Sequence, residues 1–429
     1  MRQTKVVLIG AGSASFGLSM LSDAVNTPEL AGSTISLVDI DSEALEATAA
    51  VARKMNEESG AGLKIEHTVD RTRALPDAEF VVISIAVNRF ELWKLDWEVP
   101  LKHGVRHTLG ENGGPGGLFH CMRNVPIILD ICRDIERLCP DALVLNFTNP
   151  VTRICMAVDR FSNVKSVGLC HGIQGELHRL EHVMGVDPHS LDAKAAGLNH
   201  FSWILGLRFK DSGEDAYPEL RRKLRDYDPT FEPLARKMFE AFGFYPSPGD
   251  DHIGEYLPYA AEYCPMHGFD FDSAEKYKKE TWDRIGRIVG GQESVEELVS
   301  RRSGERAFGI IAGILSNSNH VELAVNVPND GHISNLSQDA IVEVPAAVSG
   351  AGVRGISIGM LPPGIAALCQ TQVGVQELAV RAAVTGDRGI ALQALLADPV
   401  IQSAEAAEKI LDELLAVHAD YLPQFRKCP

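Results

Sequence analysis

Three short segments of the chain carry side chains that bind metals or transfer protons. They are Asn146-Phe147-Thr148-Asn149-Pro150, Cys170-His171-Gly172-Ile173 and Gly197-Leu198-Asn199-His200. A thiolate and an imidazole are good ligands for a borderline divalent ion, and water or substrate hydroxyls can fill the remaining positions. The distance between Cys170 and His200 in the sequence excludes a local metal motif. Cys170 also fits a small buried hydrophobic residue at a strand end, and His200 alone is equally ambiguous.

A glycine-rich turn follows the first apolar run, Val6 to Ile9. The turn and the residues after it read Gly10-Ala11-Gly12-Ser13-Ala14-Ser15-Phe16, the first two glycines of the G-x-G-x-x-G dinucleotide fingerprint with Ser15 in place of the third. The two glycines permit a tight turn and a close approach of backbone to pyrophosphate, and the following helix offers N–H groups to the anion. Two glycines alone do not establish a site.

A carboxylate at the end of the second apolar run strengthens the dinucleotide interpretation. Asp39 stands where it would bind the ribose hydroxyls of NAD and repel the 2′-phosphate of NADP. The alternative is that Asp39 and Asp41 cap the next helix. Asn88 and Arg89 follow the third run, at the edge where open α/β sheets bind ligands. The cofactor contacts that we assign are Gly10, Gly12, Ser13, Phe16, Asp39, Asn88 and Asn146.

The elements that must position these residues form a repeating pattern over the first 200 residues. Apolar runs alternate with helix-length segments; they are Val6 to Ile9, Ile35 to Val38, Phe80 to Ile85, Leu143 to Phe147 and Ser166 to Leu169. Continuous apolar strands separated by helices are typical of a parallel sheet buried on both faces. The pattern predicts an α/β fold with a Rossmann-type, doubly wound parallel sheet.

The second half of the chain has a different pattern. It has a charged amphipathic stretch at residues 219–236, a Pro/Gly/Asp-rich loop at 245–251, helical patterns at 273–316, strand alternation at 321–345 and helix again at 373–417. We predict an NAD-binding domain over residues 1–195 and a mixed α+β domain over 196–429 that binds substrate and metal and forms oligomers.

Composition narrows the class of protein. The chain has 429 residues, 45% of them hydrophobic, with a net charge of −17 and eight cysteines without paired spacing. We expect two domains, reduced thiols, a cytoplasmic location and a small-molecule partner, with neither nucleic acid nor membrane as a partner. These residues support an NAD enzyme with a possible metal, and Asn149-Pro150-Val151 would equally suit a lactate or malate dehydrogenase-like protein.

A wider set of segments resembles family 4 of the glycoside hydrolases, and the resemblance covers nearly the whole chain. The matching segments are Gly10-x-Gly12-Ser13, Asp39, Gly110-Glu111-Asn112-Gly113-Gly114-Pro115-Gly116-Gly117, Asn146-x-x-Asn149-Pro150, Cys170-His171, Gly197-x-Asn199-His200-x-x-Trp203, Asn326-x-x-Asn329-x-Gly331 and Val342-Glu343-Val344-Pro345. The resemblance implies an architecture like that of lactate and malate dehydrogenases, with NAD and Mn²⁺, or another divalent transition metal, as cofactors.

The resemblance also implies redox chemistry in place of the usual two-carboxylate displacement. NAD would take a hydride from C3 of the sugar, a base would remove the C2 proton, the glycosidic oxygen would leave, and water and hydride would then add back. A metal on the C2 and C3 oxygens would stabilise the developing negative charge.

Residue roles follow from the same resemblance. Cys170 and His200 match the family's metal ligands. For the C2 base we predict Asp250, with Asp251 or His252 as alternatives. The non-catalytic alternative is that the Gly-Asp pair at this position only forms a turn. For the leaving-group acid we consider His171 and Glu111. The residues assigned to substrate binding are Asn149, Arg89 and Asn199.

The cysteine segment also bears on the substrate. Cys170-His171-Gly172-Ile173 departs from the Cys-Asn-x-Pro and Cys-Asp-x-Pro patterns of 6-phospho-glycosidases, which implies an unphosphorylated sugar, as an α-glucoside or α-glucuronide. Arg89 or Arg123 would supply a cation for a uronate. The alternatives are an α-galactosidase or α-galacturonidase of the family, an NAD-dependent sugar or 2-hydroxy acid dehydrogenase, and a non-catalytic NAD sensor. Family resemblance implies a homodimer or homotetramer.

Overall fold

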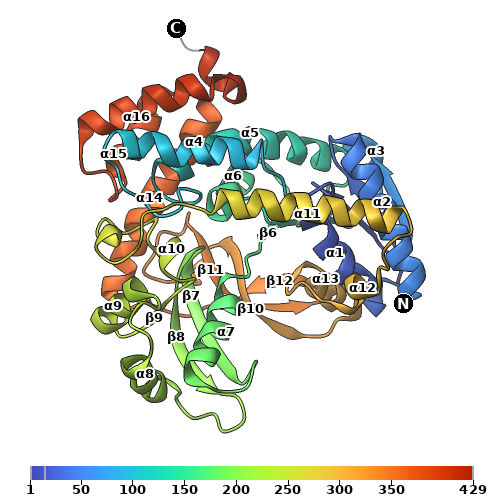
Figure 1. Cartoon of the computed structure of the whole chain (residues 1–429), viewed down its shortest axis with the longest axis horizontal. Coiled ribbons are helices and arrows are strands. Elements are labelled where there is room, and N and C mark those ends of the chain that lie inside the picture. The colour runs from blue at the N-terminus through green and yellow to red at the C-terminus, as the bar shows by residue number, and fades with distance from the viewer. Residues whose placement is uncertain (1, 14–15, 428–429) are drawn as a thin grey trace.

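A single sheet runs through the molecule and joins its two halves (Figure 1). The computed structural model describes residues 2–13 and 16–427. The strand order is β3-β2-β1-β4-β5-β6-β10-β11-β7-β8-β9, and β12 pairs with β11. The sheet therefore continues from the first half into the second through the pairing of β6 with β10.

The first six strands form the parallel part of the sheet, in the order 3-2-1-4-5-6 of a dinucleotide-binding fold. They are β1 (Lys5–Ile9), β2 (Thr34–Val38), β3 (Lys64–Thr68), β4 (Phe80–Ile83), β5 (Leu143–Asn146) and β6 (Lys165–Gly168). The predicted doubly wound sheet is confirmed, and the five apolar runs are five of its strands. Strand β3 was not predicted from the apolar runs, because it is a largely polar edge strand that is never fully buried.

Helices cover both faces of the parallel strands, so alternate strand residues face two separate cores. These helices are α1 (Phe16–Val25), α2 (Ser42–Ser59), α3 (Arg71–Ala74), α4 (Arg89–Lys102), α5 (Gly114–Leu138), α6 (Val151–Phe161) and α7 (Gly172–Met184). Val7 and Val81 face the core under α5 and α6, whereas Val6 and Val82 face the opposite core. Both sheet faces are thus closed, and ligands have access at the strand ends.

The second half is antiparallel, as the predicted mixed α+β domain requires. Its strands are β7 (Leu191–Leu198), β8 (Phe201–Phe209), β9 (Tyr245–Ser247), β10 (His320–Pro328), β11 (Ile341–Ser349) and β12 (Gly352–Gly355). Its longer helices are α8 (Tyr217–Asp226), α9 (Pro233–Phe242), α11 (Phe271–Val289) and α13 (Ala307–Ser316), with short helices α10 (Asp250–Ile253) and α12 (Glu296–Ser300). The predicted division at residue 195 falls inside β7, so it stays a prediction.

The last three helices return to the first half of the molecule. They are α14 (Pro363–Thr385), α15 (Arg388–Ala397) and α16 (Ala404–Val417). Figure 1 shows them beside α4 and α5, and α14 packs on α5 and α6 while α16 packs on α4. Within residues 2–13 and 16–427, no helix is long and apolar enough to cross a bilayer.

Candidate active site

The turn after β1 has the geometry of a dinucleotide loop. Gly10 has a φ of +92°, and a Cβ there would lie 1.9 Å from the carbonyl oxygen of Ser84. The N–H of Gly12 donates to Asp39 Oδ2 at 2.8 Å, which ties the turn to the end of β2. Phe16 N donates to Ser13 Oγ at 3.3 Å where α1 begins. Ser15, the substituted fingerprint position, lies outside the described residues.

Two of the predicted cofactor contacts use their side chains within the protein instead. Asn146 is buried, and its amide bonds both the N–H and the carbonyl of Thr148, so it shapes the turn after β5. Asn88 precedes α4 and donates to the hydroxyl of Tyr421 at 2.7 Å. Each amide thus has a structural partner, and its predicted contact with NAD stays a prediction.

The proposed metal ligands are brought together by the fold. Cys170 follows β6, and Asn199 with His200 forms the two-residue turn between β7 and β8. Cys170 Sγ lies 3.3 Å from His200 Nε2. His200 has a φ of +59°, a conformation that residues with a Cβ rarely adopt and that often marks functional sites. The structure thus assembles a thiol–imidazole pair from positions 30 residues apart.

His200 also belongs to a group with two further side chains, His252 and Glu255, and Cys170 contacts this group through His200. The ligand atoms of His200, His252 and Glu255 all lie within 4.8 Å of one another. His200 Nδ1, His252 Nδ1 and Glu255 Oε2 are buried and have no hydrogen-bond partner in the described chain. Such unpartnered atoms at one point fit a metal ion. Glu255 was not among the residues predicted from the sequence, although its His-x-x-Glu spacing from His252 in a short helical turn was a signal for it.

Burial keeps the thiol and the two imidazoles of the cluster uncharged in the absence of a cation. It raises the pKa of the Cys170 thiol to about 11 and lowers the pKa of His200 and of His252. Neutral imidazole is the form that binds metals, and a thiol loses its proton when it binds one. The donor set therefore suits a divalent transition metal.

Asn199 supports the turn that carries His200. Its side-chain amide donates to Glu343 Oε1 at 2.9 Å, and Ser202 Oγ donates to Glu343 Oε2 at 2.6 Å. Asn199 and Glu343 are both buried. Asn199 therefore orients the turn, and its predicted contact with substrate stays a prediction.

The glycine-rich loop, residues 107–113, covers the cluster. Glu255 Oε1 accepts hydrogen bonds from the N–H groups of Glu111 at 2.6 Å and Asn112 at 2.9 Å, with Gly113 at 3.4 Å. A Cβ on Gly113 would lie 2.4 Å from the carbonyl oxygen of Glu255. One carboxylate therefore holds the loop with one oxygen and faces the cluster with the other.

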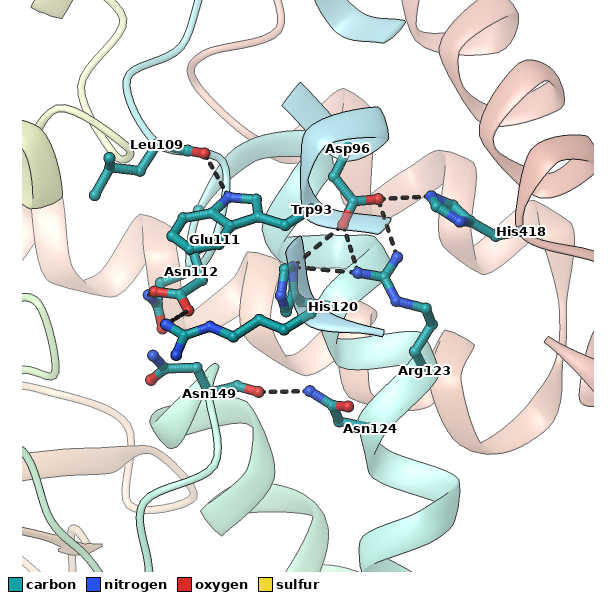
Figure 2. Close-up of polar contacts among 12 residues, drawn as sticks. Trp93, Asp96, Leu109, Glu111, Asn112, His120, Arg123, Asn124, Asn149 and His418 are labelled. Atoms are coloured by element: carbon teal, nitrogen blue, oxygen red, sulfur yellow. Dashed lines mark hydrogen bonds and ion pairs between the residues drawn. The ribbon is translucent and has the colours of Figure 1, made fainter. Parts of the chain in front are cut away.

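Glu111, labelled in Figure 2, is a buried carboxylate that pairs with Arg89 at 3.0 Å. Burial by itself would raise its pKa, but Arg89 and the neighbouring histidines outweigh burial and lower the pKa below its usual value. Asn112 also donates to it at 3.3 Å. A carboxylate that stays ionised does not suit the predicted role of leaving-group acid and better suits binding a hydroxyl.

His171 lies at the rim of the cluster. Its Nδ1 lies 3.2 Å from Glu305 Oε1, and this hydrogen bond raises the pKa of His171 to about 9. Its side chain is 70% exposed. His171 is therefore protonated at neutral pH and open to a ligand, as a proton donor must be.

The three residues considered for the C2 base differ sharply in their surroundings. Asp250 accepts from the backbone N–H groups of Leu234 at 3.0 Å and Ala235 at 2.8 Å, so both oxygens cap α9. Asp251 is exposed, and only its backbone carbonyl, which accepts from Thr108, has a described bond. His252 belongs to the cluster. Asp250, the predicted base, therefore has both carboxylate oxygens engaged in capping a helix. His252 lies in the cluster and is better placed to act as the base.

The predicted sugar contacts can also be placed. Asn149 is half-buried, and its backbone carbonyl accepts from Asn124 Nδ2 at 2.9 Å (Figure 2). Arg89 is 43% exposed and remains open to a ligand. Arg123 is buried in a bidentate pair with Asp96, so it is not available for the uronate carboxylate that we considered.

The fold and the site define a dinucleotide-fold protein with a buried Cys/His/Glu cluster at its sheet edge. Comparison with known proteins then identifies the family. Residues 5–186 match the family 4 glycosyl hydrolase model, and residues 195–401 match its C-terminal domain. The chain belongs to family 4 of the glycosyl hydrolases.

Two curated relatives match along almost their whole length. An alpha-glucosidase of Erwinia rhapontici is 36% identical over 98% of this chain and 99% of its own. An alpha-galactosidase of Bacillus subtilis is 30% identical over 98% of this chain and 100% of its own. These relatives share the family but differ in the sugar that they are named for.

Solved structures confirm the fold. The putative glucosidase lplD of Bacillus subtilis superposes with a TM-score of 0.88 at 29% identity, covering 97% of this chain and 100% of that one. A 6-phospho-alpha-glucosidase from gut microorganisms, solved with NAD and Mn²⁺, gives 0.88 at 22% identity and covers 99% and 100%. A malate dehydrogenase of Cryptosporidium parvum gives 0.54 at 16% identity, covering 89% and 99%. The predicted dehydrogenase-like architecture is confirmed.

Proposed function

We propose that this family 4 glycosyl hydrolase cleaves α-glycosides of an unphosphorylated, glucose-configured sugar, an α-glucoside or an α-glucuronide, and that it needs NAD and Mn²⁺ or a similar metal. The observation that carries the proposal is the Cys170–His200 pair beside His252 and Glu255. The alpha-glucosidase among the relatives supports the glucose configuration.

The residues present fit both cofactors. NAD would lie on the turn held by Gly12 and Asp39, and Cys170, His200 and Glu255 would hold the metal, which leaves His252 free to act as a base. When bound, the two groups supply a reversible hydride acceptor for C3 and a positive charge next to the C2 and C3 oxygens.

The chain's own side chains supply the proton transfers. His252 is neutral at pH 7, because burial lowers its pKa, and its Nδ1 has no hydrogen-bond partner in the described chain, so it can accept the C2 proton. His171 is protonated and exposed, so it can donate a proton to the leaving oxygen. The base and the acid are thus two different side chains, and each has the protonation state that its step requires at neutral pH.

We expect Arg89 and Glu111 to bind the sugar. Arg89 is an exposed cation that already bonds one carboxylate, Glu111, and could turn to a uronate carboxylate. Glu111, kept ionised, would accept a hydrogen bond from a sugar hydroxyl. Asn149 stands where β5 ends and would contact the same sugar. A homodimer or homotetramer in the cytoplasm remains an expectation from the family.

The test is a panel of p-nitrophenyl α- and β-glycosides, with α-glucoside, α-glucuronide, α-galactoside and α-galacturonide, assayed with and without NAD, Mn²⁺ and a thiol reductant. We expect nitrophenol release from a glucose-configured α-glycoside only with both cofactors present and without net NADH. Net NADH from a sugar or hydroxy acid without bond cleavage would identify a dehydrogenase and refute the proposal.

A further inference from the structure

Helix α4 holds the glycine-rich loop from one side. Trp97 Nε1 donates to the carbonyl of Thr108 at 2.9 Å, and Trp93 Nε1 donates to the carbonyl of Leu109 at 2.7 Å. Arg89, in the first turn of α4, pairs with Glu111. The loop's position therefore depends on where α4 lies.

The other side of α4 is held by the end of the chain. Near the C-terminal end of α4, Glu413 binds Lys102 Nζ at 2.7 Å and His103 Nε2 at 2.8 Å. In the middle, His418 Nε2 lies 2.8 Å from Asp96 Oδ1. At the start, the Tyr421 hydroxyl accepts from Asn88 Nδ2. We call Glu413, His418 and Tyr421 the C-terminal clamp.

The middle contact of the clamp is the most buried. Asp96 and His418 are both fully buried, and Asp96 also binds Arg123 and lies 3.2 Å from His120 Nδ1 on α5 (Figure 2). A single carboxylate thus joins α4, α5 and the end of the chain. Removing the His418 donor would leave Asp96 Oδ1, an oxygen of a buried carboxylate, with the hydrogen bond from Arg123 alone.

We propose that the C-terminal clamp positions the glycine-rich loop for catalysis, and that His418 and Tyr421 are positioning residues that act on Glu111 through α4. The effect on the reaction rests on the function proposed above; the effect on the loop does not. The far end of the sequence thereby sets the geometry at the cluster, although no clamp residue belongs to it.

Hydrogen exchange measured by mass spectrometry on the full chain tests the loop directly, without any need for activity. We expect the amides of residues 107–113 to exchange roughly fivefold to tenfold faster in His418→Leu and Tyr421→Phe, the change typical of a lost hydrogen bond. His418→Gln retains an N–H donor and should recover much of the protection. Asp412→Asn, on the solvent side of α16 where it pairs with Arg388, is the control and should change nothing.

Kinetics on the same variants separates the clamp proposal from the proposed glycosidase function. If the loop loosens, kcat/KM should fall by a similar factor in Tyr421→Phe and His418→Leu, through KM for the glycoside more than through kcat. Loop exchange equal to wild type in folded Tyr421→Phe and His418→Leu would overturn the clamp. Faster exchange in an enzyme inactive on every glycoside would instead uphold the clamp and refute the proposed function.

Discussion

Replacing Glu255 by Gln removes one charge from the metal cluster while keeping an acceptor for the loop. In the wild type, Oε1 accepts from the N–H groups of Glu111 and Asn112, whereas Oε2 has no hydrogen bond among the described residues and lies 4.0 Å from His252 Nδ1. A glutamine oxygen can still accept from the loop amides. The substitution therefore separates the carboxylate's effect on the metal from its effect on the loop.

The size of the effect follows from Coulomb's law. A unit negative charge and a divalent cation about 5 Å apart at an effective dielectric constant of about 20 attract each other by about 7 kcal/mol, and the glutamine dipole and solvent recover part of this loss. Measured losses for residues that support a metal site are roughly 10- to 100-fold in affinity, or about 1.4 to 2.8 kcal/mol. We expect the Mn²⁺ dissociation constant of Glu255→Gln to rise by that factor, with a melting temperature close to that of wild type.

The assay is calorimetric titration with Mn²⁺ in parallel with the Mn²⁺ dependence of glycoside cleavage. Glu262→Gln, which removes an exposed charge from the same segment, is the matched control and should bind Mn²⁺ as the wild type does. Equal Mn²⁺ affinity in Glu255→Gln and the wild type would refute the assignment of Glu255 to the metal cluster.

Three further predictions concern other parts of the molecule. Cys170→Ser should raise the Mn²⁺ dissociation constant at least about 10-fold with little change in melting temperature, and unchanged Mn²⁺ dependence would exclude the thiol as a ligand. Asp39→Ala should raise KM for NAD roughly 10-fold by freeing the Gly12 turn, and an unchanged KM would show that Asp39 only supports the helix that follows. Burial raises the pKa of Asp398 from 3.8 to about 6. A raised folded-state pKa favours folding below pH 3.8, and this contribution is lost as pH rises through 6, so the free energy of unfolding should fall by about 1.4 kcal/mol between pH 5 and 8 from this group. Urea denaturation across that range should show a smaller fall in Asp398→Asn, and an equal fall would contradict the pKa.

The sequence predicted the parts of the fold that depend on local patterns. Strands β1, β2, β4, β5 and β6 could be recognised because a sheet covered on both faces favours mostly apolar runs in its buried strands. Strand β3 was not predicted because it lies at the sheet edge, where Lys64 and Glu66 are exposed to water.

The site was predictable where residue type alone limits the chemistry. A thiol and an imidazole at strand ends, Cys170 and His200, suggested a possible metal site, and the family resemblance implied that they are its ligands; the structure places them in contact. The tasks of carboxylates were not predictable, because Asp250 caps a helix and Glu255 holds a loop through contacts with residues remote in sequence. Only three-dimensional neighbours decide which acidic residue remains free for catalysis.

Glycoside cleavage in D₂O tests the proposed redox mechanism most directly. If His252 or another base removes the C2 proton before the glycosidic bond breaks, the released sugar exchanges that proton with solvent. We predict deuterium at C2 of the product by NMR, in a reaction that requires NAD and Mn²⁺. A product that retains its C2 proton quantitatively would contradict deprotonation at C2 and with it the proposed mechanism.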